Sequence, residues 1–209
     1  MTGLPTPRVL LMACGGLLAC CGVTGCGNGP CGRDTHNKMI VSVRDQQMLL
    51  VRDGTPVKYY QISTSKFGLG DHPGSNCTPI GRLQVNQKIG DNKAIGSVFK
   101  NRRPTGEIVR PNAPGRDPIV TRILWLKGTE SRNRNAYHRL IYIHGTPEEQ
   151  RLGRPASYGC IRMGSRDVAD LYKRVGYGAD VFVIRGSIQT QPSHPATASR
   201  GTPDGQPRG

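Results

Sequence analysis

Residues 39–62 read MIVSVRDQQMLLVRDGTPVKYYQI, and this stretch decides the fold because it holds three β-prone runs separated by polar turns. The runs cover residues 39–43, 47–51 and 57–62, and each is short and rich in Val, Ile, Leu or Tyr. The Asp53-Gly54 pair between the last two runs is a strong signal for a tight turn. Three short strands joined by tight turns predict an antiparallel meander.

The same alternation of apolar runs and turns continues towards the C-terminus. Further strand-like runs occupy residues 82–89, 119–126, 140–143 and 181–184. Residues 101–118 are mostly Arg, Pro, Gly and Asn with almost no periodicity, so they are expected to form a long irregular loop.

One segment has the period of a helix. Its apolar residues lie at i, i+3, i+4 and i+7, as Val168, Leu171, Tyr172 and Val175. Ser165 is the predicted N-cap and Gly176 the predicted C-terminal cap. The chain is therefore predicted to be mainly β with one or more short helices, which is an α+β fold.

The composition narrows the class of protein. The chain has 209 residues and a formal net charge of +15, and only 5% of its residues are aromatic. No apolar run reaches the roughly 18 to 20 residues of an ordinary membrane span, which excludes a multi-pass membrane protein. The positive charge favours a polyanionic partner: nucleic acid, anionic lipid or an acidic cell-wall glycan. With few aromatic rings to stack on bases, nucleic acid is the weakest of the three.

The N-terminal segment has the features of an export signal. Arg8 precedes an apolar run over residues 9–19, and small residues follow. Two tetrapeptides, ending at Cys20 and Cys26, resemble bacterial lipoprotein cleavage sites in which the final Cys receives the lipid. The two residues before Cys26 are small, so Cys26 is the predicted lipid anchor and Cys20 the alternative. We expect an exported, lipid-anchored protein of the cell envelope, with a plain secreted protein as the competing interpretation.

These features divide the chain into four parts. Residues 1–25 are predicted as a lipoprotein-type signal peptide, 26–38 as a linker, 39–185 as the folded domain and 186–209 as a disordered tail. The tail is mostly Ser, Thr, Pro, Gly and Gln, so burial of apolar groups would not offset the entropy of ordering it.

Export also changes what the cysteines are expected to do. If Cys26 is the anchor, the mature chain keeps Cys31, Cys77 and Cys160, an odd number that leaves one thiol free or paired between chains. Cys31 and Cys77 are candidates for a disulfide in an oxidising envelope, and the sequence leaves that pairing open. Their spacing from nearby histidines matches no compact zinc motif, so no metal site is predicted.

The most informative segments are Ile143-His144-Gly145-Thr146 and Ser157-Tyr158-Gly159-Cys160-Ile161-Arg162-Met163. His144 ends a strand-like run sixteen residues before Cys160, which follows a Gly in a predicted tight turn. A Cys nucleophile needs a neighbouring base and donors that face the developing oxyanion. A strand-end His and a turn with free backbone N–H groups supply both. An inert buried Cys is the competing interpretation from residue types alone.

The same segments resemble the signature of the bacterial L,D-transpeptidases, the YkuD-like catalytic domain, in which His-Gly-Thr precedes Ser-His-Gly-Cys-Ile-Arg by about this interval. Thr-Pro-Ile-Gly at residues 78–81 resembles the Thr-Pro-x-Gly turn found upstream in that family. The strand run to His144 and the helix after Cys160 follow in the same order. The resemblance covers about residues 39–184 and implies an L,D-transpeptidase-like β-sandwich catalytic domain.

The resemblance implies acyl transfer on peptidoglycan stem peptides without a metal or an organic cofactor. Cys160 is then the nucleophile, attacking the carbonyl between a diamino acid at stem position three and the D-Ala at position four. His144 is the base, and the backbone carbonyl of Gly145 orients its imidazole. The backbone N–H groups of Tyr158, Gly159 and Cys160 are expected to hold the oxyanion.

One position departs from the family pattern. The family commonly has His immediately before the Gly-Cys pair, whereas this chain has Tyr158. If that His only shapes the oxyanion turn, Tyr replaces it through its backbone N–H and ring packing; if it shares proton transfer, the enzyme is slow or altered in specificity. We favour the first, because His144 remains as the base. An L,D-carboxypeptidase that uses water as acceptor, or a non-catalytic wall-binding lipoprotein, are the competing functions.

The residues around the Cys have less specific roles. Arg162 and Ser157 are the substrate-side candidates: the Arg162 guanidinium suits a substrate carboxylate, with a structural bridge as an equal alternative. For Ser157 we favour hydrogen bonds within the turn. Residues 101–118 are either a lid over an acidic stem peptide or a solvated loop. The predicted partners are peptidoglycan stem peptides and, through the anchor, a membrane, but not nucleic acid.

Overall fold

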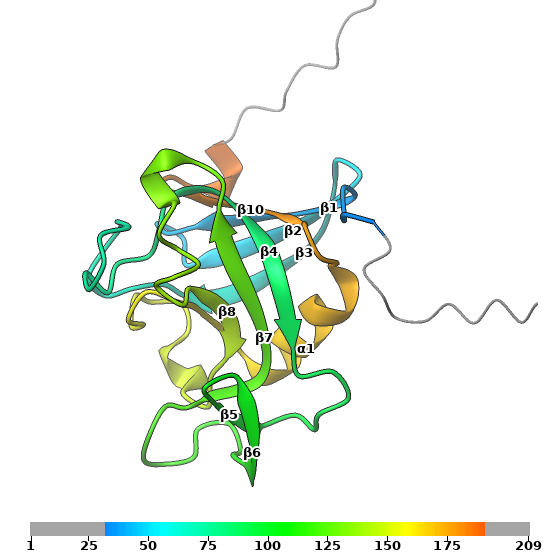
Figure 1. The fold of residues 1–209 in the computed structure, drawn as a ribbon, viewed down its shortest axis with the longest axis vertical. Coiled ribbons are helices and arrows are strands. Elements are labelled where there is room, and N and C mark those ends of the chain that lie inside the picture. The colour runs from blue at the N-terminus through cyan, green and yellow to red at the C-terminus, as the bar shows by residue number, and fades with distance from the viewer. Residues whose placement is uncertain (1–31, 191–209) are drawn as a thin grey trace, which may run out of the picture. The chain divides into compact units, whose positions relative to one another are not determined.

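The computed structural model describes residues 32–190 (Figure 1). Its strands are β1 (Asn37–Ser42), β2 (Gln47–Arg52), β3 (Thr55–Ser63), β4 (Gly81–Ile89), β5 (Ser97–Lys100), β6 (Arg103–Ile108), β7 (Ile119–Gly128), β8 (Tyr142–Gly145), β9 (Ile161–Met163) and β10 (Asp180–Ile184). Helix α1 covers Ser165–Arg174, and short 3-10 turns lie at Ser131–Asn133, Glu149–Arg151 and Ile188–Thr190. The mainly β, α+β prediction is confirmed.

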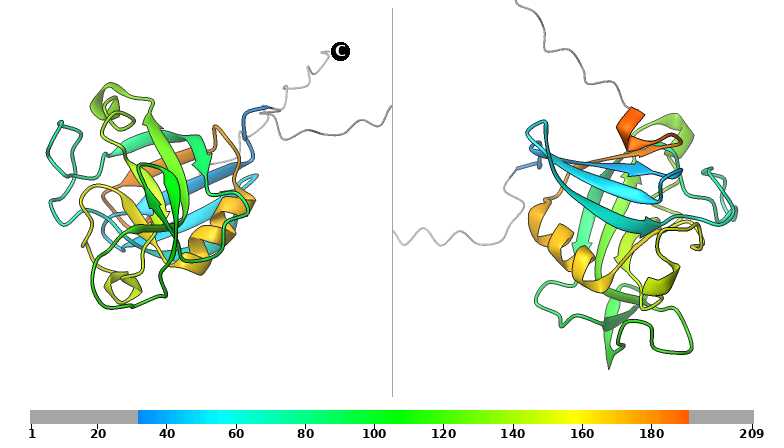
Figure 2. Two further views of the ribbon diagram at one scale, coloured as in Figure 1. Left: turned by 60° about the horizontal axis from the view of Figure 1, so that its bottom comes forward. Right: turned by 180° about the vertical axis from the view of Figure 1, so that it is seen from behind.

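The strands form one hydrogen-bonded ladder in the order β4-β10-β1-β2-β3-β9-β8-β7-β5-β6. The predicted meander is its β1-β2-β3 part, where Met39 pairs with Leu50 and Met48 with Tyr60. Strand β4 pairs with β7 as well as with β10, so the ladder closes on itself. The two sheets expected of a sandwich are therefore hydrogen-bonded to each other at their edges. Two pairs of neighbouring strands are parallel, β1 with β10 and β8 with β9. Helix α1 contacts β7 and β8, and Figure 2 shows it beside the strands from two other sides.

Helix α1 packs its apolar face into the core, as its periodicity predicts. Val168, Leu171 and Tyr172 are buried in one cluster with residues from the strands, Ile143 of β8 and Ile161 of β9 among them. Burial of each such side chain contributes about 1.5 to 3 kcal/mol to the free energy of unfolding. The helix therefore holds the two strands that border the Cys-bearing turn.

The ends of α1 differ from the prediction. Gly164 is the N-cap, with Ser165 the first helical residue, because the Glu149 carboxylate accepts the Ser165 N–H at 2.8 Å and caps the helix from outside. The hydroxyl of Ser165 instead accepts from Thr121 Oγ1 at 3.0 Å. The C-cap is Val175, in an extended conformation, and the N–H of Gly176 donates to Asp34 Oδ2 at 2.6 Å.

The prediction of an irregular loop over residues 101–118 was wrong in part. Strands β5 and β6 form a hairpin that turns at Asn101 and Arg102, both with positive φ, and it lies at the lower end of the view in Figure 1. All six residues of β6 are exposed, so no alternation of apolar and polar residues marked it in the sequence. Strand β9 was also missed, because it is three residues long and buried throughout.

The fold extends beyond the predicted domain at both ends. Within the predicted linker, the N–H of Asp34 donates to Tyr177 O at 2.7 Å and Asn37 begins β1. Within the predicted tail, Ile188 is buried against Leu49 and Val51, and its N–H donates to Asp45 Oδ2 at 3.0 Å. Cys20, Cys26 and Cys31 lie outside the described residues, as does most of the predicted tail.

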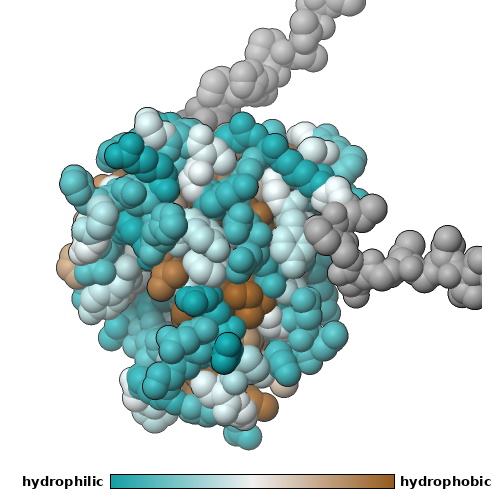
Figure 3. Space-filling view, in the orientation of Figure 1, coloured by the Kyte–Doolittle hydropathy of each residue, from teal (hydrophilic) through white to brown (hydrophobic). Residues whose placement is uncertain are grey.

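The surface is mostly hydrophilic, as expected for a chain in which only 35% of the residues are hydrophobic. The face shown in Figure 3 is mostly hydrophilic, with apolar residues in small separate patches. Among residues 32–190, no helix is long and apolar enough to cross a membrane.

Candidate active site

His144 sits on β8, between β7 and β9 in the sheet, and only 6% of it is exposed. In the parallel pairing of β8 with β9, His144 lies opposite Arg162. Its Nδ1 lies 2.8 Å from the carbonyl oxygen of Gly145. A carbonyl oxygen only accepts, so Nδ1 carries the proton and the lone pair of the neutral ring is on Nε2.

Gly145 has a physical reason to be glycine. A Cβ at this position would lie 2.6 Å from the carbonyl oxygen of Val120, inside van der Waals contact. Strand β7 is irregular here, since its register against β8 shifts between Val120 and Ile123 and Thr121 has a φ of 70°. Positive φ is strained for a β-branched residue, and such bulges often re-aim strands beside functional sites. The close approach of β7 fixes the carbonyl that orients His144.

Burial sets the protonation state of His144. It lowers the pKa of the imidazole, while the hydrogen bond to Gly145 O and the charge of Asp117 raise it and the charge of Arg162 lowers it further. The net shift is downwards, so the ring is neutral at neutral pH and its Nε2 can accept a proton.

Cys160 ends the turn that precedes β9. Its Sγ accepts from the Tyr142 N–H at 3.4 Å, and the thiol donates to Leu140 O at 3.4 Å. Burial raises the pKa of the thiol to about 11, although the Tyr142 N–H and the charges of Arg139 and Arg162 act to lower it. The resting residue is therefore a thiol held by two backbone groups, with no preformed thiolate.

The turn itself is held by Ser157. Its hydroxyl donates to Cys160 O at 2.6 Å and accepts the Gly159 N–H at 3.3 Å. Gly159 has a φ of 119°, and a Cβ there would lie 3.3 Å from Cys77 O, so this corner requires glycine. Ser157 is buried, and both of these bonds lie within the turn. Within residues 32–190, the N–H groups of Tyr158 and Cys160 have no hydrogen-bond acceptor.

The structure brings five of the predicted site residues, all but Gly145 and Gly159, to one pocket of about 160 Å³. Its lining consists of Asp117, Ile119, His144, Ser157, Tyr158, Cys160 and Arg162. A neutral imidazole with a free Nε2 and a neutral thiol share this pocket. The arrangement provides a base and a latent nucleophile in the same space, which is what cysteine acyl transfer requires.

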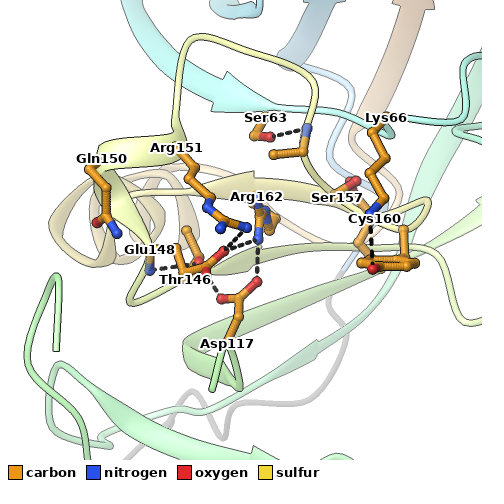
Figure 4. Close-up of polar contacts among 12 residues, drawn as sticks. Ser63, Lys66, Asp117, Thr146, Glu148, Gln150, Arg151, Ser157, Cys160 and Arg162 are labelled. Carbon is orange, nitrogen blue, oxygen red and sulfur yellow. Dashed lines mark hydrogen bonds and ion pairs between the residues drawn. The ribbon is translucent and has the colours of Figure 1, made fainter. Parts of the chain in front are cut away.

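The ion pairs of Arg162 in the structure are with two acidic residues of the chain itself. Its side chain is 4% exposed, and its Nη1 pairs with Asp117 and, at 3.1 Å, with Glu148 (Figure 4). Its Nε and Nη2 are buried without a hydrogen-bond partner among the described residues. Nη1 is paired and the other two nitrogens are buried, so the guanidinium can bind a substrate carboxylate only if the residues around it move. This favours the structural bridge.

Sequence reasoning missed the acids around Arg162. Asp117 comes from the end of the segment before β7, accepts from Thr146 Oγ1 and lines the pocket. Glu148 pairs with Arg151 at 3.2 Å as well as with Arg162. Thr146 of the His-Gly-Thr motif was the one sequence feature that indicated such an acid, because a buried hydroxyl needs a hydrogen-bond partner. Of the predicted lid segment, only Asp117 lines this pocket.

A buried ion pair contacts the segment at Cys77, which packs against Gly159 of the Cys-bearing turn. Arg139 and Asp71 pair at 3.0 Å, and Arg139 Nη2 donates to Cys77 O at 2.7 Å. Cys77 is a free thiol, and its predicted partner Cys31 lies outside the described residues. In the described part of the chain, no group of three or more His, Cys, Asp or Glu side chains is placed to hold a metal ion.

Known proteins resemble this chain in sequence. The family profile of the L,D-transpeptidase catalytic domain, YkuD, matches residues 36–184. A Bacillus subtilis (strain 168) protein, YqjB, whose name assigns it to the L,D-transpeptidases, is 26% identical over 161 residues, which are 75% of each chain.

Solved structures that resemble this chain include an L,D-transpeptidase from Mycobacterium smegmatis, with 17% identity and a TM-score of 0.46 over 71% of this chain. An Enterococcus faecium L,D-transpeptidase C442S mutant gives 19% identity and a TM-score of 0.46 over 71% of this chain. The matches span only 58% and 50% of those two chains. On the strength of the family match, which covers most of its length, this chain belongs to the L,D-transpeptidase catalytic-domain family.

Proposed function

We propose that the protein is a cysteine-dependent peptidoglycan L,D-transpeptidase with Cys160 as nucleophile and His144 as base. One observation carries the proposal: both side chains line the same pocket, and the bond from His144 to Gly145 O leaves Nε2 free for the thiol proton. Membership of the family supplies the substrate class, the stem peptides of peptidoglycan.

The first half-reaction begins from the neutral pair. Nε2 of His144 accepts the proton of the Cys160 thiol as sulfur attacks the carbonyl between the stem diamino acid and D-Ala. The resulting imidazolium then protonates the D-Ala nitrogen as its bond to the carbonyl carbon breaks. D-Ala leaves as a free amino acid, and the acyl group remains on Cys160 as a thioester.

The oxyanion formed in that step needs backbone donors. Gly159 donates its N–H to Ser157 Oγ, so the groups available in the turn are the N–H groups of Tyr158 and Cys160. Each well-placed donor lowers such a barrier by about 3 to 4 kcal/mol. A backbone donor does not depend on the side chain, which agrees with Tyr158 in place of the family's usual His.

The second half-reaction restores the enzyme. An acceptor amine attacks the thioester carbonyl, His144 takes a proton from the amine, and the thiolate leaves and is reprotonated. The product is a new amide cross-link, or an amide to another acceptor amine, in cell wall biogenesis. Export and lipidation at Cys26, with Cys20 as the alternative, would place this reaction in the cell envelope, and both remain predictions.

The test is incubation of the purified protein with tetrapeptide muropeptides, followed by mass spectrometry of the products. We expect released D-Ala together with a cross-linked dimer, and neither product from Cys160→Ala. Release of D-Ala without any cross-link would identify an L,D-carboxypeptidase. Absence of both from the wild-type protein would contradict the proposal and favour a non-catalytic wall-binding protein.

A further inference from the structure

A second cavity, of about 350 Å³, lies beside the Cys160 pocket, and Tyr158 forms a wall of both. Its lining consists of Lys66, Arg151, Arg154, Pro155, Ala156 and Tyr158. Three of these residues are cations and none is an acid. We call this cavity the basic pocket.

The cations of the basic pocket are exposed and only partly paired. Arg151 Nη1 pairs with Glu148 at 3.2 Å, whereas no carboxylate lies within ion-pair distance of Lys66 or Arg154 in the described part of the chain. Three like charges around one cavity repel one another, and an anion between them removes that repulsion. The site is therefore electrostatically suited to an anionic group.

Lys66 is held in place by aromatic rings. Its Nζ lies 4.4 Å from the centre of the Tyr158 ring and 5.2 Å from that of Phe67, and it donates to Tyr158 Oη at 3.0 Å. The two rings contact each other at a centroid distance of 5.4 Å. Such cation–π contacts reduce the freedom of a long side chain, so less entropy is lost when Lys66 binds a ligand.

The backbone around the cavity is tied to the catalytic turn. The N–H of Lys66 donates to Ser157 O at 3.1 Å, and the N–H of Ala156 donates to Thr64 O at 3.0 Å. The carbonyl of Arg154 accepts from Ser63 Oγ at 2.7 Å. These bonds fix the backbone segments that carry Lys66 and Arg154 relative to the turn that ends at Cys160.

We propose that the basic pocket binds a free carboxylate of the stem peptide while the scissile or attacking group lies in the Cys160 pocket. The proposal takes its substrate class from the proposed function, and its site from Lys66, Arg154 and Tyr158. Charge-assisted hydrogen bonds from Lys and Arg are the strong contacts for carboxylates. Tyr158 then has a specific role: the residue is 64% exposed, and its ring and hydroxyl position Lys66 at the border of the two cavities.

Binding to the full-length Cys160→Ala protein tests the pocket without requiring catalysis. Two probes are compared by calorimetry: a stem tetrapeptide with free carboxylates, and the same peptide with those carboxylates converted to carboxamides. We expect the acid to bind about tenfold more tightly, and Lys66→Gln with Arg154→Gln to remove that preference. The matched control is Lys38→Gln with Arg44→Gln, two exposed cations at β1 and the turn after it.

The contradicting outcomes are specific. The proposal for the basic pocket would be overturned by equal affinity for the acid and the amide, or by no binding of the acid. It would also be overturned if the preference for the acid survived the Lys66 and Arg154 substitutions. Because Cys160→Ala cannot turn over, these outcomes are independent of whether the wild-type protein transfers acyl groups.

A kinetic measurement on the wild-type enzyme identifies the source of the carboxylate. If the donor stem supplies it, Lys66→Gln with Arg154→Gln raises the KM for donor about tenfold and leaves that for acceptor and kcat unchanged. If the acceptor stem supplies it, the KM for acceptor rises instead. A change in kcat alone, with both KM values unchanged, would contradict a binding role.

Discussion

The two cavities that share Tyr158 differ in how they hold their polar groups. In the Cys160 pocket, His144 is buried and neutral, and each reactive group is oriented by backbone atoms. In the basic pocket, the cations are exposed, and only Lys66 among them is held by aromatic rings. The difference indicates that the two cavities have separate roles. Chemistry depends on geometry and protonation in the first cavity, whereas recognition depends on net charge in the second.

The largest effect that separates the two cavities is expected from Cys160→Ser. The hydroxyl is far less acidic than the thiol, and a neutral imidazole is a weak base for it, so acyl transfer should fall by at least about 10³-fold. Affinity of the acid peptide for the basic pocket should change less than about twofold. Product formation and calorimetry on the same protein check the two outcomes. A large loss of peptide affinity would show that the cavities are not separable.

Removal of the Arg162 guanidinium should affect folding more than binding. Arg162→Gln leaves Asp117 and Glu148 close together without their shared cation, which should lower the free energy of unfolding by about 3 kcal/mol. Urea denaturation measures it, with Arg166→Gln, an exposed change on α1, as the control expected within about 0.5 kcal/mol. A stable variant with a strongly raised substrate KM would instead restore the substrate-contact interpretation.

The pH dependence of thiol alkylation tests the neutral pair. Because burial raises the pKa of Cys160 to about 11 and lowers that of His144, the fraction of thiolate rises only as the pH approaches that value. The rate of alkylation of Cys160 by iodoacetamide, followed by peptide mapping, should keep increasing from pH 6 to pH 10. A plateau beginning near pH 6 would indicate a preformed thiolate–imidazolium pair, contrary to the structure.

Loss of the Ser157 hydroxyl should have a moderate effect confined to the first cavity. Ser157→Ala removes the bonds to Cys160 O and from Gly159 N–H, which should lower stability by about 1 kcal/mol and reduce kcat with little change in KM. Thermal unfolding and steady-state kinetics are the measurements. A rise in KM with unchanged stability would show that the hydroxyl contacts substrate.

The smallest expected difference is in salt dependence. Charges exposed to solvent are screened, so binding of the acid peptide should weaken several-fold between low salt and roughly 0.5 M salt. The alkylation rate of Cys160 at constant pH should change little over the same range, because its hydrogen-bond partners are uncharged backbone groups. Equal salt sensitivity of both would remove the distinction between the cavities.

The same contrast explains what the sequence could predict. The meander and α1 could be predicted because their buried faces place apolar residues at regular spacing. His144 and Cys160 could be predicted because few residue types perform their chemistry. Strand β6 has no buried face, and the cap of α1 comes from Glu149, a side chain sixteen residues away in sequence from Ser165.

The sequence did not predict which charged residues of the site contact one another. Asp117 lies 45 residues before Arg162 in the chain, and Lys66 lies 92 residues before Tyr158. Nothing local marks either pair, because only the fold decides which loops meet at the pocket. The net charge of the chain indicated an anionic partner without indicating where that partner would bind.

The proposed reaction depends most on Cys160 as the residue that carries the acyl group. Intact-protein and peptide mass spectrometry after exposure to a tetrapeptide donor, with no acceptor amine present, tests this directly. The predicted result is a donor-minus-D-Ala adduct on the peptide containing Cys160 in the wild-type protein, and none in His144→Ala. An adduct on Cys77, or no adduct while D-Ala is released, would contradict a Cys160 thioester.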